Sequence, residues 1–256
     1  ADMRSRGFMI GGTAGRTTLN GEGLQHQDGN SHLLAYPVPN LKAYDPAFAF
    51  ELAAIIKDGI RRMYVEQEDI FYYITVENEP YAMPPQPEGS EEGILRGMYC
   101  YRPSGSEGAE LRANLFGSGA ILNEALRAQE ILAERFNVAA DVWSITSFME
   151  LFMDGTDCDR FNRLHGPEEH RTPWIQQCLS GNDSVCVIAS DYVKALPNSI
   201  GKWFPKTPVA LGTDGFGRSE SRAALRRFFE VEWSRFRFRN GTLPGLHQHR
   251  DRIEGP

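Results

Sequence analysis

The stretch from Asn20 to His32 is the part of the sequence richest in side chains that can do chemistry. It holds two histidines, His26 and His32, and two carboxylates, Glu22 and Asp28. Histidine has an ordinary pKa of about 6.5, so it can give and take protons near neutral pH, and its cation can hold a carboxylate. The four residues are therefore candidates for acid–base or substrate-binding work.

A structural role is an equal alternative for the same residues. The pairs Asn20-Gly21 and Asp28-Gly29 are typical of turns, and a histidine can cap or hydrogen-bond a loop. Residue types and spacing leave both interpretations open.

Strand and helix patterns alternate around this stretch. The run Phe8–Ile10 predicts a strand, and Ile70–Val76 predicts a buried one, because it is aromatic and β-branched. Asp45-Pro46 predicts the start of a helix with Ile55 and Ile56 on its apolar face. Further strands are expected at 111–116, 141–147, 184–189 and 209–211, and helices at 121–136 and 219–229. The sequence therefore predicts an α/β protein with mainly parallel sheets.

Composition narrows the class of protein. The chain has 256 residues, 41% of them hydrophobic, and a net charge of −7, which argues against a nucleic-acid partner or an anionic membrane. Its four cysteines form no CxxC pair and no zinc spacing, which favours a reducing, cytoplasmic setting. The sequence has no apolar run of the roughly 20 residues that span a bilayer.

Three other segments resemble sites, and an ordinary loop is the favoured interpretation of each. The turn Gly117–Gly119 precedes a helix and could hold a phosphate. Residues 214–218 could form an anion nest with Arg218. His165, Glu168, Glu169 and His170 could be imagined as metal ligands.

Residues 15–32 read GRTTLNGEGLQHQDGNSH, which resembles a signature of the homodimeric bacterial pyruvate dehydrogenases, thiamine diphosphate enzymes of the transketolase superfamily. The resemblance continues to about residue 232, and includes Gly212–Ser219. It implies thiamine diphosphate and Mg²⁺ as cofactors, pyruvate as substrate, the lipoyl domain of dihydrolipoyl acetyltransferase as acceptor, and a homodimer.

The resemblance also implies roles for residues. The position of His26 lies on the substrate side of the cofactor in that family, with Glu22 in the same loop. Asp28 and His32 are similar to the Asp-Gly-x-x-His of transketolases, whose histidine contacts substrate. We expect His26 to bind substrate or transfer a proton, and His32 to support it.

The resemblance divides the chain into parts. We expect residues 1–80 to end a pyrimidine-binding-type domain, 81–108 to be a Pro/Gly-rich linker, and 109–232 to form a transketolase C-terminal-type domain. Residues 233–256 depart from the family pattern and are expected to be disordered.

The family's Gly-Asp-Gly metal and diphosphate motif is absent from the sequence. We therefore expect the cofactors to be held mainly by sequence outside this chain, which alone would be inactive. The alternatives are a non-catalytic dimerisation or docking module, and another transketolase-like enzyme acting on a 2-oxo acid or a ketose.

Overall fold

Strand β3, Phe71–Val76, is the centre of the first of two sheets. It pairs in parallel with β1, Phe8–Gly12, on one side and with β2, Leu41–Tyr44, on the other. Helix α2, Ala49–Ile60, covers this sheet and packs Ile55 against buried aromatic and branched residues. The structure is a computed structural model that describes residues 1–105 and 109–236.

The second sheet has five strands in the order β4-β6-β5-β7-β8. Strand β4 runs antiparallel to β6, and the other pairs are parallel. The strands are β4 Met98–Arg102, β5 Leu111–Gly117, β6 Val138–Ile145, β7 Val185–Ala189 and β8 Val209–Leu211. The helices of this unit are α3 Glu91–Arg96, α4 Leu122–Phe136, α5 Phe148–Leu164, α6 Trp174–Cys178, α7 Ala195–Asn198 and α8 Arg222–Phe229.

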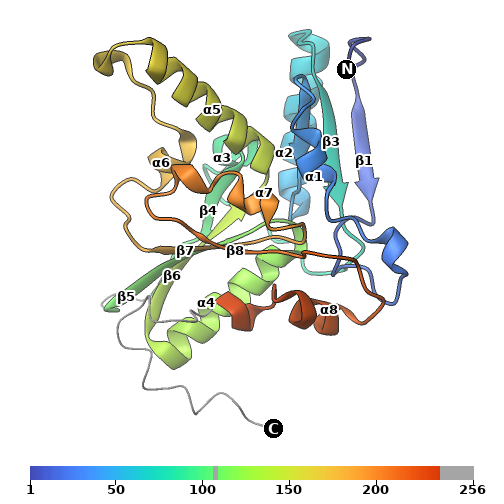
Figure 1. Cartoon of the computed structure of the whole chain (residues 1–256), viewed down its shortest axis with the longest axis vertical. Coiled ribbons are helices and arrows are strands. Elements are labelled where there is room, and N and C mark those ends of the chain that lie inside the picture. Colours follow the sequence, from blue (N-terminus) through green and yellow to red (C-terminus); the bar gives the residue numbers. More distant parts are fainter. Residues whose placement is uncertain (106–108, 237–256) are drawn as a thin grey trace.

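Helices cover both faces of the second sheet, as a parallel sheet requires. Helices α4 and α8 lie on one face and α5, α6 and α7 on the other (Figure 1). Each face has its own apolar core, one built around Leu122 and Leu225, the other around Phe116 and Trp203. The expected α/β fold with mainly parallel sheets is confirmed.

The two units are joined by buried polar contacts. Glu51 of α2 is fully buried and accepts hydrogen bonds from Tyr99 Oη and Ser144 Oγ, both at 2.7 Å, and both in the second sheet. Its other oxygen accepts from the backbone N–H groups of Ala47 and Phe48. Burial raises the pKa of the Glu51 carboxyl, and these four donors oppose that rise. The first unit is therefore fixed to the second.

Several expectations need correction. Helix α2 begins at Ala49, and Asp45 does not cap it, because the Asp45 carboxylate accepts a hydrogen bond from Thr75 instead. The segment expected as a linker, residues 81–108, contains α3 and β4, so its irregular part is shorter than expected. Strand β2 and helix α5 had not been predicted.

The expectation of disorder from residue 233 onward is wrong for the first part of that segment. Trp233–Phe236 form a 3-10 helical turn, and Phe236 is completely buried in the core beneath α4 and α8. The remainder of that prediction, residues 237–256, lies outside the described residues. Among the residues that the structure describes, no helix has both the length and the apolar character needed to cross a bilayer.

Candidate functional site

Glu22, His26 and Asp28 lie on the long connection between β1 and helix α1, Ser31–Ala35, and His32 lies inside α1. This connection is held against the second unit. The backbone N–H of Thr17 donates to both carboxylate oxygens of Asp191, at 2.9 and 3.1 Å, just beyond the end of β7. Arg16 is buried and donates to the carbonyl oxygens of Thr213 and Gly215, the latter at 2.6 Å.

Glu22 and His26 are exposed in the middle of this connection. His26 ends a short 3-10 helix, Leu24–His26, and neither side chain has a hydrogen bond or ion pair with any other described residue. The exposed segment that carries them is bounded by two well-buried residues, Leu19 and Gln27. These two groups are therefore presented outward on a fixed base, where a substrate or another part of an enzyme can meet them.

His32 is placed differently, because it is 2% exposed inside α1. Its Nε2 atom lies 2.9 Å from Thr75 Oγ1, and its ring packs against Tyr73 and Tyr192. Burial lowers the pKa of His32, opposed by the negative charges of Asp45 and Asp28. His32 is therefore a neutral interior side chain rather than an exposed partner of His26.

Asp28 is half-buried and serves the start of α1. Its carboxylate accepts hydrogen bonds from the backbone N–H groups of Asn30 at 2.9 Å and Ser31 at 3.0 Å, and from the Ser31 hydroxyl. These contacts are those of an Asp-initiated turn. Asp28 and His32 therefore make the contacts expected of residues with a structural role. Glu22 and His26 make no such contacts with the described residues.

Two residues that anchor the site were missed from the sequence, Arg16 and Asp191. Burial raises the pKa of Asp191 to about 6, opposed mainly by the Thr17 hydrogen bonds. A sequence signal for Asp191 did exist, because it follows the C-terminal end of a parallel strand, where α/β proteins place functional groups. Arg16 lies in the recognised signature, but its partners are nearly 200 residues away.

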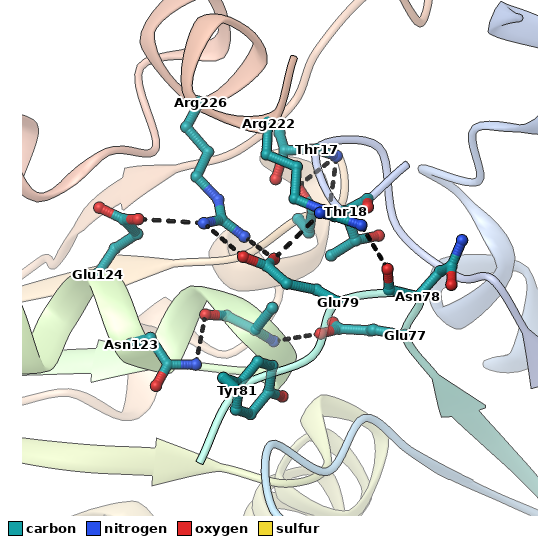
Figure 2. Close-up of polar contacts among 12 residues, drawn as sticks. Thr17, Thr18, Glu77, Asn78, Glu79, Tyr81, Asn123, Glu124, Arg222 and Arg226 are labelled. Atoms are coloured by element: carbon teal, nitrogen blue, oxygen red, sulfur yellow. Dashed lines mark hydrogen bonds and ion pairs between the residues drawn. The ribbon is translucent and has the colours of Figure 1, made fainter. Parts of the chain in front are cut away.

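The turn Gly117–Gly119 is occupied by the protein's own groups. The N–H of Ala120 donates to Glu77 Oε2 at 2.5 Å, and the N–H of Gly119 donates to the Asp45 carbonyl at 3.2 Å. Figure 2 shows Glu77 pointing at this turn. Because these donors are taken, the geometry favours a tight turn over a phosphate site.

A charged cluster ties α8 to the segment after β3 (Figure 2). Arg226 lies 3.2 Å from both Glu79 Oε1 and Glu124 Oε1, and all three side chains are mostly buried. Arg222 donates to the backbone carbonyl oxygens of Thr18, at 2.6 Å, and Asn78, at 2.5 Å. Helix α8 therefore also contacts the connection that carries the candidate residues.

The metal-ligand alternative has no support from the geometry. Over residues 1–105 and 109–236, no three His, Cys, Asp or Glu side chains are grouped so as to hold a metal ion. His165, Glu168, Glu169 and His170 are exposed, and His165 Nδ1 pairs with the Phe161 carbonyl at 2.8 Å.

Comparison with family models matches each unit to a known domain. Residues 1–84 match the middle domain of the pyruvate dehydrogenase E1 component, and residues 97–232 match the transketolase-like C-terminal domain. The fold and this pair of domains define a protein of the transketolase-like class. The chain belongs to the transketolase-like C-terminal domain family, whose model matches more than half of it, and within that class it is similar to the pyruvate dehydrogenase E1 components.

Individual relatives agree with this assignment. The chain is 52% identical over 232 residues to the pyruvate dehydrogenase E1 component of Pseudomonas aeruginosa, an alignment that covers 90% of this chain. It is 51% identical over 235 residues to that of Escherichia coli K12, covering 91% of this chain. The chain spans 26% of the length of each relative.

Solved structures show the same fold at low sequence identity. A mutant transketolase from Pichia stipitis matches 90% of this chain and 29% of its own with a TM-score of 0.63 and 15% identity. Transketolase from Campylobacter jejuni matches 90% of this chain and 30% of its own with a TM-score of 0.62 and 16% identity.

Proposed function

We propose that this chain supplies the substrate-side wall of the active site of a pyruvate dehydrogenase E1 enzyme. The enzyme would decarboxylate pyruvate oxidatively and transfer the acetyl group to the lipoyl group of the acyltransferase. The observation that carries the proposal is the presentation of His26 and Glu22, exposed and without partners among the described residues, on a connection fixed at both ends to buried structure.

Among the described residues, the turn Gly117–Gly119 already binds Glu77 and Asp45, and no three His, Cys, Asp or Glu side chains are grouped so as to hold a metal ion. We therefore assign thiamine diphosphate and Mg²⁺ to the rest of a homodimeric enzyme. The thiamine group supplies the carbanion chemistry on the ketone of the substrate. The residues of this chain bind, orient and exchange protons.

His26 is the residue proposed to act on the substrate. An imidazolium can hold the carboxylate of pyruvate, and it can give a proton to the sulfur that leaves when the lipoyl disulfide opens. Glu22 lies four residues earlier on the same exposed segment and can hold the charge of that imidazolium. Asp28 and His32 support the segment from within, through α1 and Thr75.

The test uses a chimera in which residues 1–232 replace the aligned region of the Escherichia coli relative. His26→Ala is expected to lower pyruvate turnover and lipoyl acetylation by about a hundredfold, the usual contribution of a positioned acid or base. His32→Ala tests the supporting role and should lower both as well. His165→Ala is the matched control, because that histidine is exposed and far along the chain.

The assignment of the site is wrong if His26→Ala and His32→Ala both leave turnover and acetylation within a fewfold of the parent chimera. Assays with 2-oxoglutarate and pentulose phosphates distinguish pyruvate from the substrates of other transketolase-like enzymes. A parent chimera that folds but shows no calorimetric binding of thiamine diphosphate would favour the non-catalytic module.

A further inference from the structure

The exposed segment with Glu22 and His26 is clamped at both ends by one short piece of the second unit, residues 218–220. At the far end, Gln27 follows His26 directly and is 8% exposed. Its side-chain amide donates to the Arg218 carbonyl at 2.6 Å and accepts from the Arg218 N–H at 2.7 Å. The amide thus pairs with both backbone groups of one residue, as a neighbouring strand would.

The near end has a similar pair of bonds. The N–H of Gly21 donates to the Glu220 carbonyl at 3.0 Å, and the Gly21 carbonyl accepts from Ser219 Oγ at 3.1 Å. Gly217 permits the close approach, because a Cβ at that position would lie 2.4 Å from Gln27 Oε1. Four hydrogen bonds therefore hold a segment whose central side chains make none with the residues that the structure describes.

We propose that Gln27 is a positioning residue, which holds His26 in its working orientation through its paired bonds with Arg218. This inference rests on the function proposed for His26. Gln27 does not touch the reacting groups. It fixes the backbone next to the histidine, so that the imidazole approaches the substrate from a defined place.

The size of the expected effect follows from geometry. Misplacement of a catalytic group by about 1 Å can cost about a hundredfold in rate. Gln27→Ala removes both bonds to Arg218 but leaves the Gly21 bonds in place. We therefore expect a partial displacement of His26 and a loss of about tenfold in kcat/KM for pyruvate in the chimera.

Gln25→Ala is the matched control, because Gln25 has the same side chain, lies two residues away and is exposed. It should leave kcat/KM within twofold. A Gln27→Ala chimera with kcat/KM within twofold of the parent, while His26→Ala is impaired, would overturn the inference and leave the proposed function intact. Absence of an effect of His26→Ala would overturn both.

A double-mutant cycle separates positioning from a general effect on the fold. If Gln27 acts through His26, then adding Gln27→Ala to His26→Ala should lower kcat/KM by less than a further twofold. The same tenfold loss in both backgrounds would mean that Gln27 acts on something other than His26, and would overturn the inference.

Hydrogen exchange gives a measurement that does not depend on activity. The Arg218 amide should exchange faster in Gln27→Ala, while the Gly21 amide, which bonds to Glu220, stays protected. If Gln27→Ala does not fold, Gln27→Met replaces it, because methionine keeps the volume of the side chain and removes both bonds to Arg218. A loss of about tenfold that is absent in a His26→Ala background supports the inference, and no loss overturns it.

Discussion

The Nε2 atom of His32 and the Oγ1 atom of Thr75 are hydrogen-bonded at 2.9 Å, and the direction of this bond can be assigned. Thr75 Oγ1 also lies 2.6 Å from Asp45 Oδ1. A hydroxyl has one hydrogen, and a carboxylate is the stronger acceptor, so Thr75 donates to Asp45. His32 must then donate from Nε2, which makes it a neutral imidazole with its proton on that atom.

This buried imidazole predicts a pH dependence of stability. Burial lowers the pKa of His32 in the folded chain. Below pH about 6.5 the unfolded state therefore binds a proton at this histidine that the folded state does not bind. Stability is therefore lost as the pH falls through 6.5. In His32→Gln, which keeps a donor for Thr75, this loss should be absent, a difference of up to about 1.4 kcal/mol per pH unit.

Urea unfolding of both proteins between pH 7.5 and 5.5 measures this difference. Asp191 works in the opposite direction, because its raised pKa of about 6 gives stability that is lost as the pH rises through that value. That contribution is common to both proteins and cancels when they are compared. An equal pH dependence of the two proteins would contradict the assignment of His32.

Glu77→Gln is expected to stabilise the chain. The Glu77 carboxyl is buried, burial and the charges of Asp45 and Asp191 raise its pKa well above the ordinary value, and its Oε1 has no hydrogen-bond partner. Asp45 Oδ2 also has none, so an amide could donate to it. Giving a hydrogen-bond partner to such buried oxygens raises the free energy of unfolding by about 1–3 kcal/mol.

The pH dependence of this gain has a defined sign. A raised folded pKa means that the Glu77 contribution to stability is lost as the pH rises above about 4.5. The amide that replaces the carboxyl in Glu77→Gln does not titrate, so the variant's advantage should grow between pH 5 and pH 8. Thermal unfolding at both values measures it, and a larger advantage at pH 5 would contradict the explanation.

Arg226→Ala is expected to destabilise the chain by about 3 kcal/mol, because it leaves two poorly exposed carboxylates, Glu79 and Glu124, without their shared cation. Arg227→Ala is the control. The Arg227 side chain is 74% exposed and lies 3.8 Å from Glu232, so its loss should cost less than about 1 kcal/mol. If both variants lost the same free energy of unfolding in chemical denaturation, the burial of the Arg226 ion pairs would be unimportant for stability.

Gly155→Ala should destabilise the chain although alanine favours helices. Gly155 lies inside α5, where an added Cβ would be 2.2 Å from the buried ring of Trp203. Overpacking of this kind costs about 1–3 kcal/mol, more than the gain in helix propensity of about 1 kcal/mol. Gly201→Ala is the control, because its added Cβ would meet Pro208 at an ordinary 3.5 Å. The melting temperature should fall only for Gly155→Ala.

Helix α5 shows where sequence patterns stop being informative. Its interior contains Gly155, Thr156 and three aspartates, all weak helix formers, so propensity argues against it. The helix is stabilised by the Ser147 cap, whose Oγ accepts from the Glu150 N–H at 3.0 Å, and by packing of Leu151 in the core. Strand β3 could be predicted because its apolar run needs no distant partner to be recognised.

The candidate site, too, could be predicted from the sequence only in part. Residue types made His26 and Glu22 candidates, the resemblance to the family favoured them, and the structure presents both at the surface. Residue types alone did not separate these two from His32 and Asp28, since the burial of His32 depends on Tyr192 and Thr75, far along the chain. The role of Gln27 was invisible for the same reason, because its partner is 191 residues away.

Gln27 and Arg218 are 191 residues apart in the chain, so the ribosome makes them at different times. Synthesis of 191 residues at about 5–20 residues per second takes about 10–40 seconds. During that time the nascent chain carries His26 outside the ribosome with no Arg218 to receive Gln27. The first unit can build its sheet early, but the loop with the histidine reaches its final shape only when almost all of the second unit has been translated.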